Sequence, residues 1–487
     1  MSLFNEYIRY ETRRQFLARG TNALGFAALA SLLGPALKLR GEDAKRPGDL
    51  LPHFRPRTKN VIYLHMVGGP SQMDLFDHKP EMKEWYDKDL PDSVRGGQRL
   101  TTMTSGQKRF PIAPSLWEFK RVGRSGIWMN EELLPWTAKC VDDMAFIRSM
   151  HTEAINHEPA ILQMQTGSMI PGRACIGSWV SYGLGSMNAN LPAFVVLIAE
   201  PTNKEQIQAI SARLWSSGFL PGEHAGVSFR SQEDAILFLN NPPGVPDALR
   251  RRQLDGLRAL NELNFRKVGD PETHTRIQQF EMAYRMQSSV PELTDVGNEP
   301  DSTYDLYGEE ARKPGTFAYN AVLSRRLVER GVRFVQLYLN NWDHHGNVAG
   351  RLPMQCKDID QATYGLITDL KQRGLLDETL ILWGGEFGRT IYSQGGLSEK
   401  NYGRDHHPRC FTMWMAGGGI QGGTVVGETD EFSYNIVKDP VHVRDLHATI
   451  LHLLGIDQRR LTYRVQGLDM KLTGVEAEAR VVKQLLA

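Results

Sequence analysis

Two short stretches of the chain each place an aspartate directly before two histidines. One is Asp343-His344-His345 and the other is Asp405-His406-His407. A carboxylate beside imidazoles is a common ligand set for a divalent metal ion, and such mixtures suit Zn²⁺ or Mn²⁺, with Ca²⁺ or Mg²⁺ as alternatives. A bound ion of this kind activates water and holds the oxygens of a transferring group. We therefore expect all six residues to contribute to a metal site; two polar loops without a metal are the alternative.

A third carboxylate stands in a glycine-rich stretch. Glu386 follows Gly384-Gly385 directly after an apolar run, and Arg389 comes three positions later. In open parallel sheets, ligands bind at the carboxyl ends of the strands. We therefore expect Glu386 to bind the metal and Arg389 to contact an anion.

Glycines and two small polar residues follow the first apolar run of the chain. The sequence there is Gly68-Gly69-Pro70-Ser71, with Asp74 three positions further on. Glycine lets the backbone approach a ligand closely, so we expect Gly68 and Gly69 to contact an anion. Ser71 is then a candidate nucleophile and Asp74 a candidate metal ligand. A tight turn in which Ser71 caps the next segment explains the same pattern.

One histidine stands at the predicted start of a helix. His157 directly precedes Glu158 and Pro159, and proline is well tolerated in the first turn of a helix. The free N–H groups and the dipole of a helix N-terminus favour anions, which places His157 at the mouth of an anion site. His157 is therefore a candidate general acid or covalent nucleophile, with a simple helix cap as the alternative.

Buried strands alternate with helical patterns along the chain, which predicts an α/β sandwich with a largely parallel sheet flanked by helices. Several of the strand candidates are nearly continuous apolar runs, as expected of strands buried on both faces. The strands are predicted at 60–67, 144–149, 193–197, 332–339, 379–383 and 411–416. The helices between them are predicted at 158–165, 176–184, 317–329, 358–372 and 443–454.

The polar region at about 205–315 is predicted to be a helical insertion, with helices at 248–265 and 275–286. It interrupts a single domain that we expect to span 46–487. The preceding segment, 1–45, contains Arg13-Arg14 followed by Phe16-Leu17 and a weakly apolar stretch, and it resembles a twin-arginine export signal. This predicts an extracytoplasmic or periplasmic protein, anchored in the membrane if the signal is not cleaved.

Charge and composition exclude several classes of protein. Lys and Arg number 57 and Asp and Glu 56, giving a net charge of +1, which excludes a strongly basic nucleic-acid binder. No apolar run approaches the length needed for a polytopic membrane protein. The four cysteines lie far apart without a CxxC pair, so a zinc ribbon or an iron–sulfur site is not expected.

Three stretches resemble the alkaline phosphatase and sulfatase superfamily. Residues 378–388 are similar to the sulfatase segment D-T-L-V-V-F-T-S-D-H-G, with Glu386 at the metal-binding Asp and Phe387 at its neighbouring His. Residues 157–167 are similar to the nucleophile helix C-x-P-S-R-x-x-x-x-T-G, with His157 at the nucleophile position. Residues 445–456 are similar to the late helix D-I-x-P-T-L-L-D-L-A-G-I. These three stretches, the export signal and the Asp-His-His motifs together resemble one exported bacterial family of this superfamily, domain of unknown function 1501.

The chain also departs from the superfamily pattern. Neither Cys nor Ser stands at 157, so the formylglycine chemistry of sulfatases is not available there. Superfamily members carry an acidic residue at the end of their first strand, where this chain has Val67-Gly68-Gly69. We expect Asp74 or His65 to take the place of that acidic residue. Phe387 stands where superfamily members have a metal-binding histidine, and we expect His406 or His407 to supply that imidazole instead.

The resemblance implies an exported metal-dependent hydrolase of phosphate or sulfate esters. Its substrate would be a small-molecule or polysaccharide ester, and no nucleic acid is expected as a partner. Ser71 or an activated water would attack the ester. The alternative is a binding or assembly protein that keeps the scaffold without turnover, since a fold does not dictate a function.

Overall fold

The computed structural model describes residues 51–487 except 206, 232–234, 237–238, 271, 399–400 and 475–477. The export signal predicted at 1–45 lies outside the described residues. Among the helices that are described, none is long and apolar enough to cross a membrane. All four cysteines are buried, and none of them forms a disulfide.

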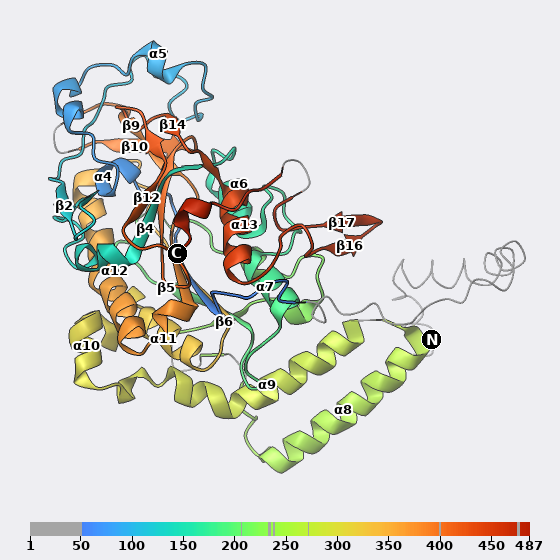
Figure 1. Cartoon of the computed structure of the whole chain (residues 1–487). Helices are drawn as coiled ribbons and strands as arrows, with labels where there is room; N and C mark the ends of the chain where they lie inside the picture. Colours follow the sequence, from blue (N-terminus) through green and yellow to red (C-terminus); the bar gives the residue numbers. More distant parts are fainter. Residues whose placement is uncertain are drawn as a thin grey trace, which may run out of the picture. The chain divides into compact units, whose positions relative to one another are not determined.

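A mostly parallel sheet lies at the centre of the α/β fold (Figure 1). Its strand order is β12-β4-β11-β8-β1-β7-β5-β6, with β15 paired to β4. Of these described strands, only β11 runs antiparallel to its neighbours, β4 and β8. The six predicted strands are all confirmed, with ends that move by at most two residues. The strands of the sheet are β1 (Asn60–Met66), β4 (Met144–His151), β5 (Phe194–Ala199), β6 (Val227–Phe229), β7 (Phe334–Leu339), β8 (Thr379–Gly384), β11 (Phe411–Ala416), β12 (Thr424–Val426) and β15 (Val441–His442).

Helices cover both faces of this sheet because side chains of a strand point alternately to opposite faces. In β1, Ile62 and Leu64 belong to one hydrophobic core, which includes side chains of α11 and α12. Val61 and Tyr63 belong to the other core, with side chains of α6, α7 and α13. The flanking helices are α6 (His157–Thr166), α7 (Ile176–Leu184), α11 (Phe317–Glu329), α12 (Val348–Gln372) and α13 (Val443–Leu453).

The helix α12 begins ten residues earlier than predicted. Asn347 caps the helix at this earlier start by accepting a hydrogen bond from the Gly350 N–H group. Pro353 lies inside α12, beyond the first turn, so the helix continues through a position at which one internal N–H hydrogen bond is missing.

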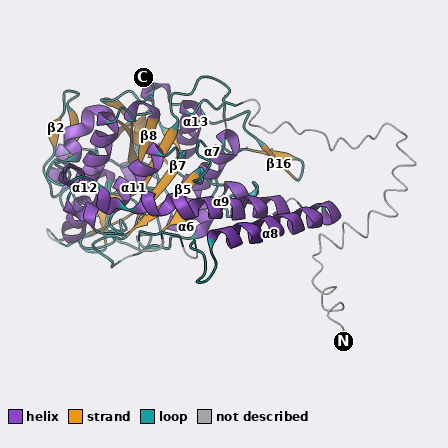
Figure 2. Ribbon diagram, turned by 90° about the horizontal axis from the view of Figure 1, so that it is seen from below, coloured by secondary structure: helices purple, strands orange, loops and turns teal. Residues whose placement is uncertain are grey.

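The predicted insertion contains more than helices. The helices α8 (Asp247–Val268) and α9 (Glu272–Thr294) lie side by side as a hairpin (Figure 2). They are followed by α10 (Asp301–Tyr307), but β6 from the same region adds a strand to the edge of the central sheet.

An antiparallel ribbon of β9 (Gly388–Gln394) and β10 (Gly403–His407) follows β8. The carboxyl ends of β1, β7 and β8 share one edge of the sheet because these neighbouring strands are parallel. The loops after them, together with this ribbon and the start of α6, carry the polar residues considered below. The remaining short elements are α4 (Gln72–Leu75), α5 (Asp92–Arg95), β2 (Lys120–Val122), β3 (Ile127–Met129), β13 (Glu428–Thr429), β14 (Ile436–Lys438), β16 (Tyr463–Val465) and β17 (Leu468–Met470).

Candidate metal centre

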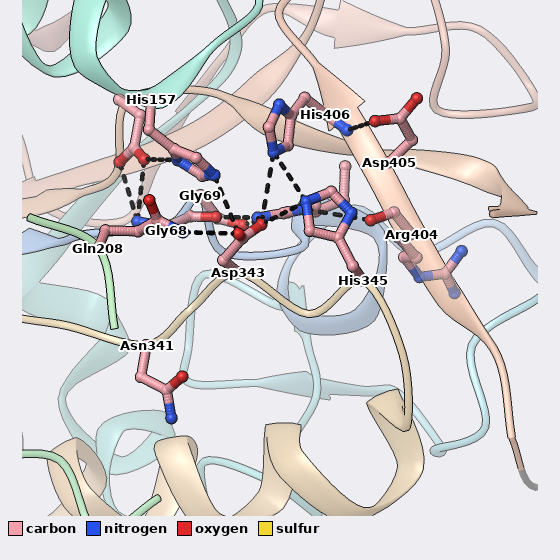
Figure 3. A network of polar contacts seen from close by, with 12 residues as sticks. Gly68, Gly69, His157, Gln208, Asn341, Asp343, His345, Arg404, Asp405 and His406 are labelled. Atoms are coloured by element: carbon pink, nitrogen blue, oxygen red, sulfur yellow. Dashed lines mark hydrogen bonds and ion pairs between the residues drawn. The ribbon is translucent and has the colours of Figure 1, made fainter. Parts of the chain in front are cut away.

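Four side chains from three separate parts of the chain converge at the carboxyl edge of the sheet (Figure 3). Each offers one ligand atom, and these atoms all lie within 4.8 Å of one another. His157 opens α6, Asp343 and His345 follow β7, and His406 lies on β10. One carboxylate and three imidazoles form a donor set that suits Zn²⁺ or a similar divalent ion.

Asp343 is the centre of this cluster. Its Oδ1 lies 2.8 Å from His345 Nε2 and 3.4 Å from His406 Nε2, and its Oδ2 lies 3.1 Å from His157 Nε2. Burial by itself would raise the pKa of Asp343, but the Arg389 guanidinium and the three imidazoles hold this pKa well below its usual range. The carboxylate is therefore ionised and available as a ligand.

The three imidazole rings share one orientation: Nδ1 of each ring contacts an oxygen acceptor outside the cluster, and Nε2 points into the cluster. His157 Nδ1 lies 2.7 Å from Glu386 Oε1, His406 Nδ1 lies 2.8 Å from the Ile155 carbonyl, and His345 Nδ1 lies 2.5 Å from Gln394 Oε1. An Nδ1 that donates to such an acceptor leaves the Nε2 lone pair free. All three Nε2 atoms face Asp343, as metal-binding imidazoles require.

Two further observations fit a cation at this position. The Nε2 atoms of His345 and His406 lie 3.0 Å apart, and burial lowers the pKa of His406 to about 4 despite its contact with Asp343. The Nε2 of His157 is buried and faces Asp343 Oδ2 as an ion pair, without the alignment of a hydrogen bond. Burial would lower the pKa of His157, but its contacts with Asp343 and Glu386 raise it. The close approach of the His345 and His406 nitrogens is what favours a candidate cation position beside Asp343.

Glu386 touches the centre only through His157. The carboxylate is fully buried, accepts a hydrogen bond from the Gly68 N–H group at 2.9 Å and lies 3.5 Å from His65 Nε2. Burial would raise its pKa, but His157 and His65 lower it to about 2. The structure thus gives this residue, expected as a metal ligand, the position of a carboxylate that orients a histidine.

The two glycines expected to contact an anion instead bring the turn after β1 against the centre. Gly68 has φ of +120°, and a Cβ there would lie 2.5 Å from the Asp343 backbone nitrogen. Gly69 has φ of +75°, and a Cβ there would collide with Phe387. Any side chain at either position would push the turn away from Asp343.

Arg389, also expected to contact an anion, is buried and bound to the protein. Its guanidinium donates to the carbonyls of Gly68, Gly69 and Arg404 and to Asp343 Oδ1. It therefore joins the glycine turn to the cluster and offsets one negative charge there.

The structure places five other predicted site residues away from this cluster. Asp74 forms a fully buried ion pair with Arg404 at 2.8 Å, and Ser71 donates a hydrogen bond to the same carboxylate at 2.6 Å. Asp405 accepts hydrogen bonds from Thr101 and Thr104. These three residues are held in buried networks of their own.

The remaining two are histidines that neighbour cluster residues. Successive side chains of a strand point to opposite faces, so His406 faces Asp343 while the ring of His407 stacks on Tyr434. His344 is buried near Trp342, and burial lowers its pKa to about 3.

Gln208 also contacts Asp343, although no motif in the sequence around it indicates a site residue. Its Nε2 donates to Asp343 Oδ2 at 2.7 Å, and its backbone N–H donates to Asn340 Oδ1 at 2.9 Å. The residue lies in the polar region after β5, where no strand or motif marks it. Gln394, which fixes His345, is likewise positioned only by the β9–β10 ribbon.

The solved structures that match this chain have low sequence identity to it. They include the PsFucS1 sulfatase from Pseudoalteromonas sp. (13% identity, TM-score 0.32, covering 82% of this chain and 68% of that one). They also include an alkaline phosphatase from the Antarctic bacterium TAB5 (9% identity, TM-score 0.30, covering 82% and 98%). A third is a protein in the alkaline phosphatase superfamily from Vibrio parahaemolyticus (10% identity, TM-score 0.34, covering 84% and 69%).

No curated protein matches the chain. One family matches nearly all of the described residues: its sequence model, described as "protein of unknown function (DUF1501)", covers residues 58–486. The chain belongs to this DUF1501 family.

Proposed function

We propose that this protein is a metal-dependent hydrolase of phosphate or sulfate esters. The observation that carries the proposal is the common orientation of three imidazoles, whose Nε2 atoms face one carboxylate while their Nδ1 atoms are bound elsewhere. A divalent ion held there would supply Lewis-acid chemistry for an ester oxygen and a water molecule.

Asp343, His345 and His406 are assigned to hold the ion. His345 and His406 both face Oδ1 of Asp343, at 2.8 Å and 3.4 Å. Catalytic zinc sites commonly use three protein ligands and keep a further position open. These three residues would provide that arrangement.

His157 is assigned a different role, that of proton transfer to or from the substrate. It faces the other carboxylate oxygen, and Glu386 holds its Nδ1 at 2.7 Å. It is also the cluster residue that lines an adjacent pocket. A histidine oriented by a carboxylate at the opening of a site is suited to general acid–base catalysis.

The charge of the centre favours an anionic substrate. Asp343 and Glu386 are negative and Arg389 is positive, so these three side chains together carry one net negative charge. Burial would lower the pKa of His157, but the two carboxylates raise it. A divalent cation would make the centre positive and attract a phosphate or sulfate group. Ser71 is bound to Asp74, so the nucleophile proposed here is a water molecule.

The test combines elemental analysis of protein purified without chelators with assays on 4-nitrophenyl phosphate and 4-nitrophenyl sulfate. We expect about one Zn²⁺ or Mn²⁺ per chain and hydrolysis of at least one ester, both lost in His345→Ala. Protein without any bound divalent metal would refute the proposal.

A binding protein without turnover is the second candidate. It is favoured by the burial of Ser71, whose side chain is 3% exposed and already hydrogen-bonded to Asp74. Stoichiometric metal without hydrolysis of either ester would support this candidate. Export by the twin-arginine route belongs to both proposals, and cell fractionation of a double variant, Arg13→Lys with Arg14→Lys, tests it.

A further inference from the structure

A pocket of about 430 Å³ opens beside His157. It lies between the first turns of α6 and the loop that runs from Gln208 to Leu214. Its size is within the range of small-molecule sites in proteins. Because His157 lines the pocket and also belongs to the cluster, a bound molecule can contact both.

The loop on the far side of the pocket is fixed to the cluster. Gln208 exchanges two hydrogen bonds with Asn340, from its backbone N–H to Oδ1 and from Asn340 Nδ2 to its carbonyl. Its side chain also donates to Asp343 at 2.7 Å. The distance between the pocket and the cluster is therefore set by the protein before any ligand binds.

The lining of the pocket includes both apolar and polar side chains. Ile161 and Leu162 of α6, each 2% exposed, and Leu214, 5% exposed, provide apolar contacts. The lining also includes Ser211 and an ion pair between Glu158 and Arg213 at 2.9 Å, whose side chains are both exposed. These residues offer both hydrogen-bond acceptors and donors.

Resting on the function proposed above, we propose that this pocket holds the ring of a sugar phosphate or sugar sulfate. A sugar ring has an apolar C–H face that suits the leucine and isoleucine side chains. Its hydroxyl edge can donate to Glu158 and accept from Arg213. A phenyl ring would make only the apolar contacts, because it has no hydroxyl groups to bind Glu158 and Arg213.

Two alanines of the same loop allow a matched test. Ala209 lines the pocket, whereas Ala212 is an exposed neighbour outside it. The variant Ala209→Trp would fill the pocket, and Ala212→Trp adds the same bulk elsewhere. Neither residue belongs to the catalytic machinery assigned above.

The experiment measures the affinity of the metal-loaded full chain for each probe, as a KM for an ester that is hydrolysed and as an inhibition constant for the others. The probes are glucose 1-phosphate, glucose 6-phosphate, glucose 6-sulfate, phenyl phosphate and inorganic phosphate. We expect at least one sugar ester to bind at least about tenfold more tightly than both inorganic phosphate and phenyl phosphate, a difference of about 1.4 kcal/mol. Ala209→Trp should remove this advantage, and Ala212→Trp should keep it.

The outcomes separate this inference from the function on which it rests. Binding of inorganic phosphate without any preference for a sugar ester would overturn the sugar assignment and leave the metal centre standing. Equal effects of the two tryptophan variants would also overturn it. Failure of the metal-loaded chain to bind any of the anions would refute the proposed function, and the sugar site with it.

Discussion

The Nε2 atoms of His345 and His406 lie 3.0 Å apart, although 61 positions separate the two residues in the chain. One follows a strand of the central sheet and the other lies on the β9–β10 ribbon. Both nitrogens also face Asp343, so the metal ion proposed above would be shared by the two rings.

The first prediction concerns two adjacent histidines of β10. His406→Ala should reduce bound Zn²⁺ or Mn²⁺ from about one ion per chain to background, because it removes a donor facing Asp343. His407→Phe should retain the metal, since the His407 ring stacks on Tyr434 and points away from Asp343; the variant loses only the hydrogen bond from Nε2 to the Tyr434 carbonyl. Elemental analysis after gel filtration measures both, and metal loss in His407→Phe with His406→Ala unaffected would contradict the geometry.

A second prediction separates metal binding from proton transfer. His157→Gln should lower kcat by about 10²–10⁴-fold, the usual contribution of general acid–base catalysis, while the metal content is unchanged. Steady-state kinetics and elemental analysis on the same preparation give both values. Loss of the ion in this variant would instead make His157 a required ligand.

Glu386 leads to a third prediction, because it acts through His157. Glu386→Gln removes the charged acceptor of the His157 Nδ1–H group and should lower activity by about 10–100-fold, as for other carboxylates that orient histidines. The metal content should remain near one ion per chain. Glu378→Gln, at an exposed carboxylate, is the control and should leave activity unchanged. Complete metal loss in Glu386→Gln would restore the direct ligand role expected from the sequence.

The positions of the strands could be predicted from the sequence because runs such as 379–383 are buried on both faces of the sheet. The same reasoning placed Asp343 and Glu386 at one edge. It could not separate His406 from His407, since this depends on which face of β10 meets Asp343. Nor could it assign Asp74 to Arg404, because that pair joins residues 330 positions apart. Gln208 carried no signal because a glutamine in a polar loop has no distinguishing neighbours.

Asp74 provides a fourth prediction, on stability. Asp74→Asn should reduce the free energy of unfolding by about 3–5 kcal/mol, because it leaves the fully buried Arg404 guanidinium without its counter-charge. Chemical denaturation measures this loss, and the protein that remains folded should still bind metal. Metal loss at unchanged stability would show that Asp74 is a ligand after all.

The last prediction concerns acid stability and a histidine outside the centre. His447 is fully buried, its Nε2 donates to the Met164 carbonyl at 2.7 Å, and burial lowers its pKa from 6.5 to about 4. Below pH 6.5 the unfolded chain binds a proton at this residue and the folded chain does not, so stability falls as the pH drops from 6.5 to 4. The contribution is about 3 kcal/mol across this window. His447→Gln keeps a donor for the carbonyl without a titrating group, so its unfolding free energy should depend less steeply on pH than that of the parent chain; identical slopes for the two proteins would contradict the assignment.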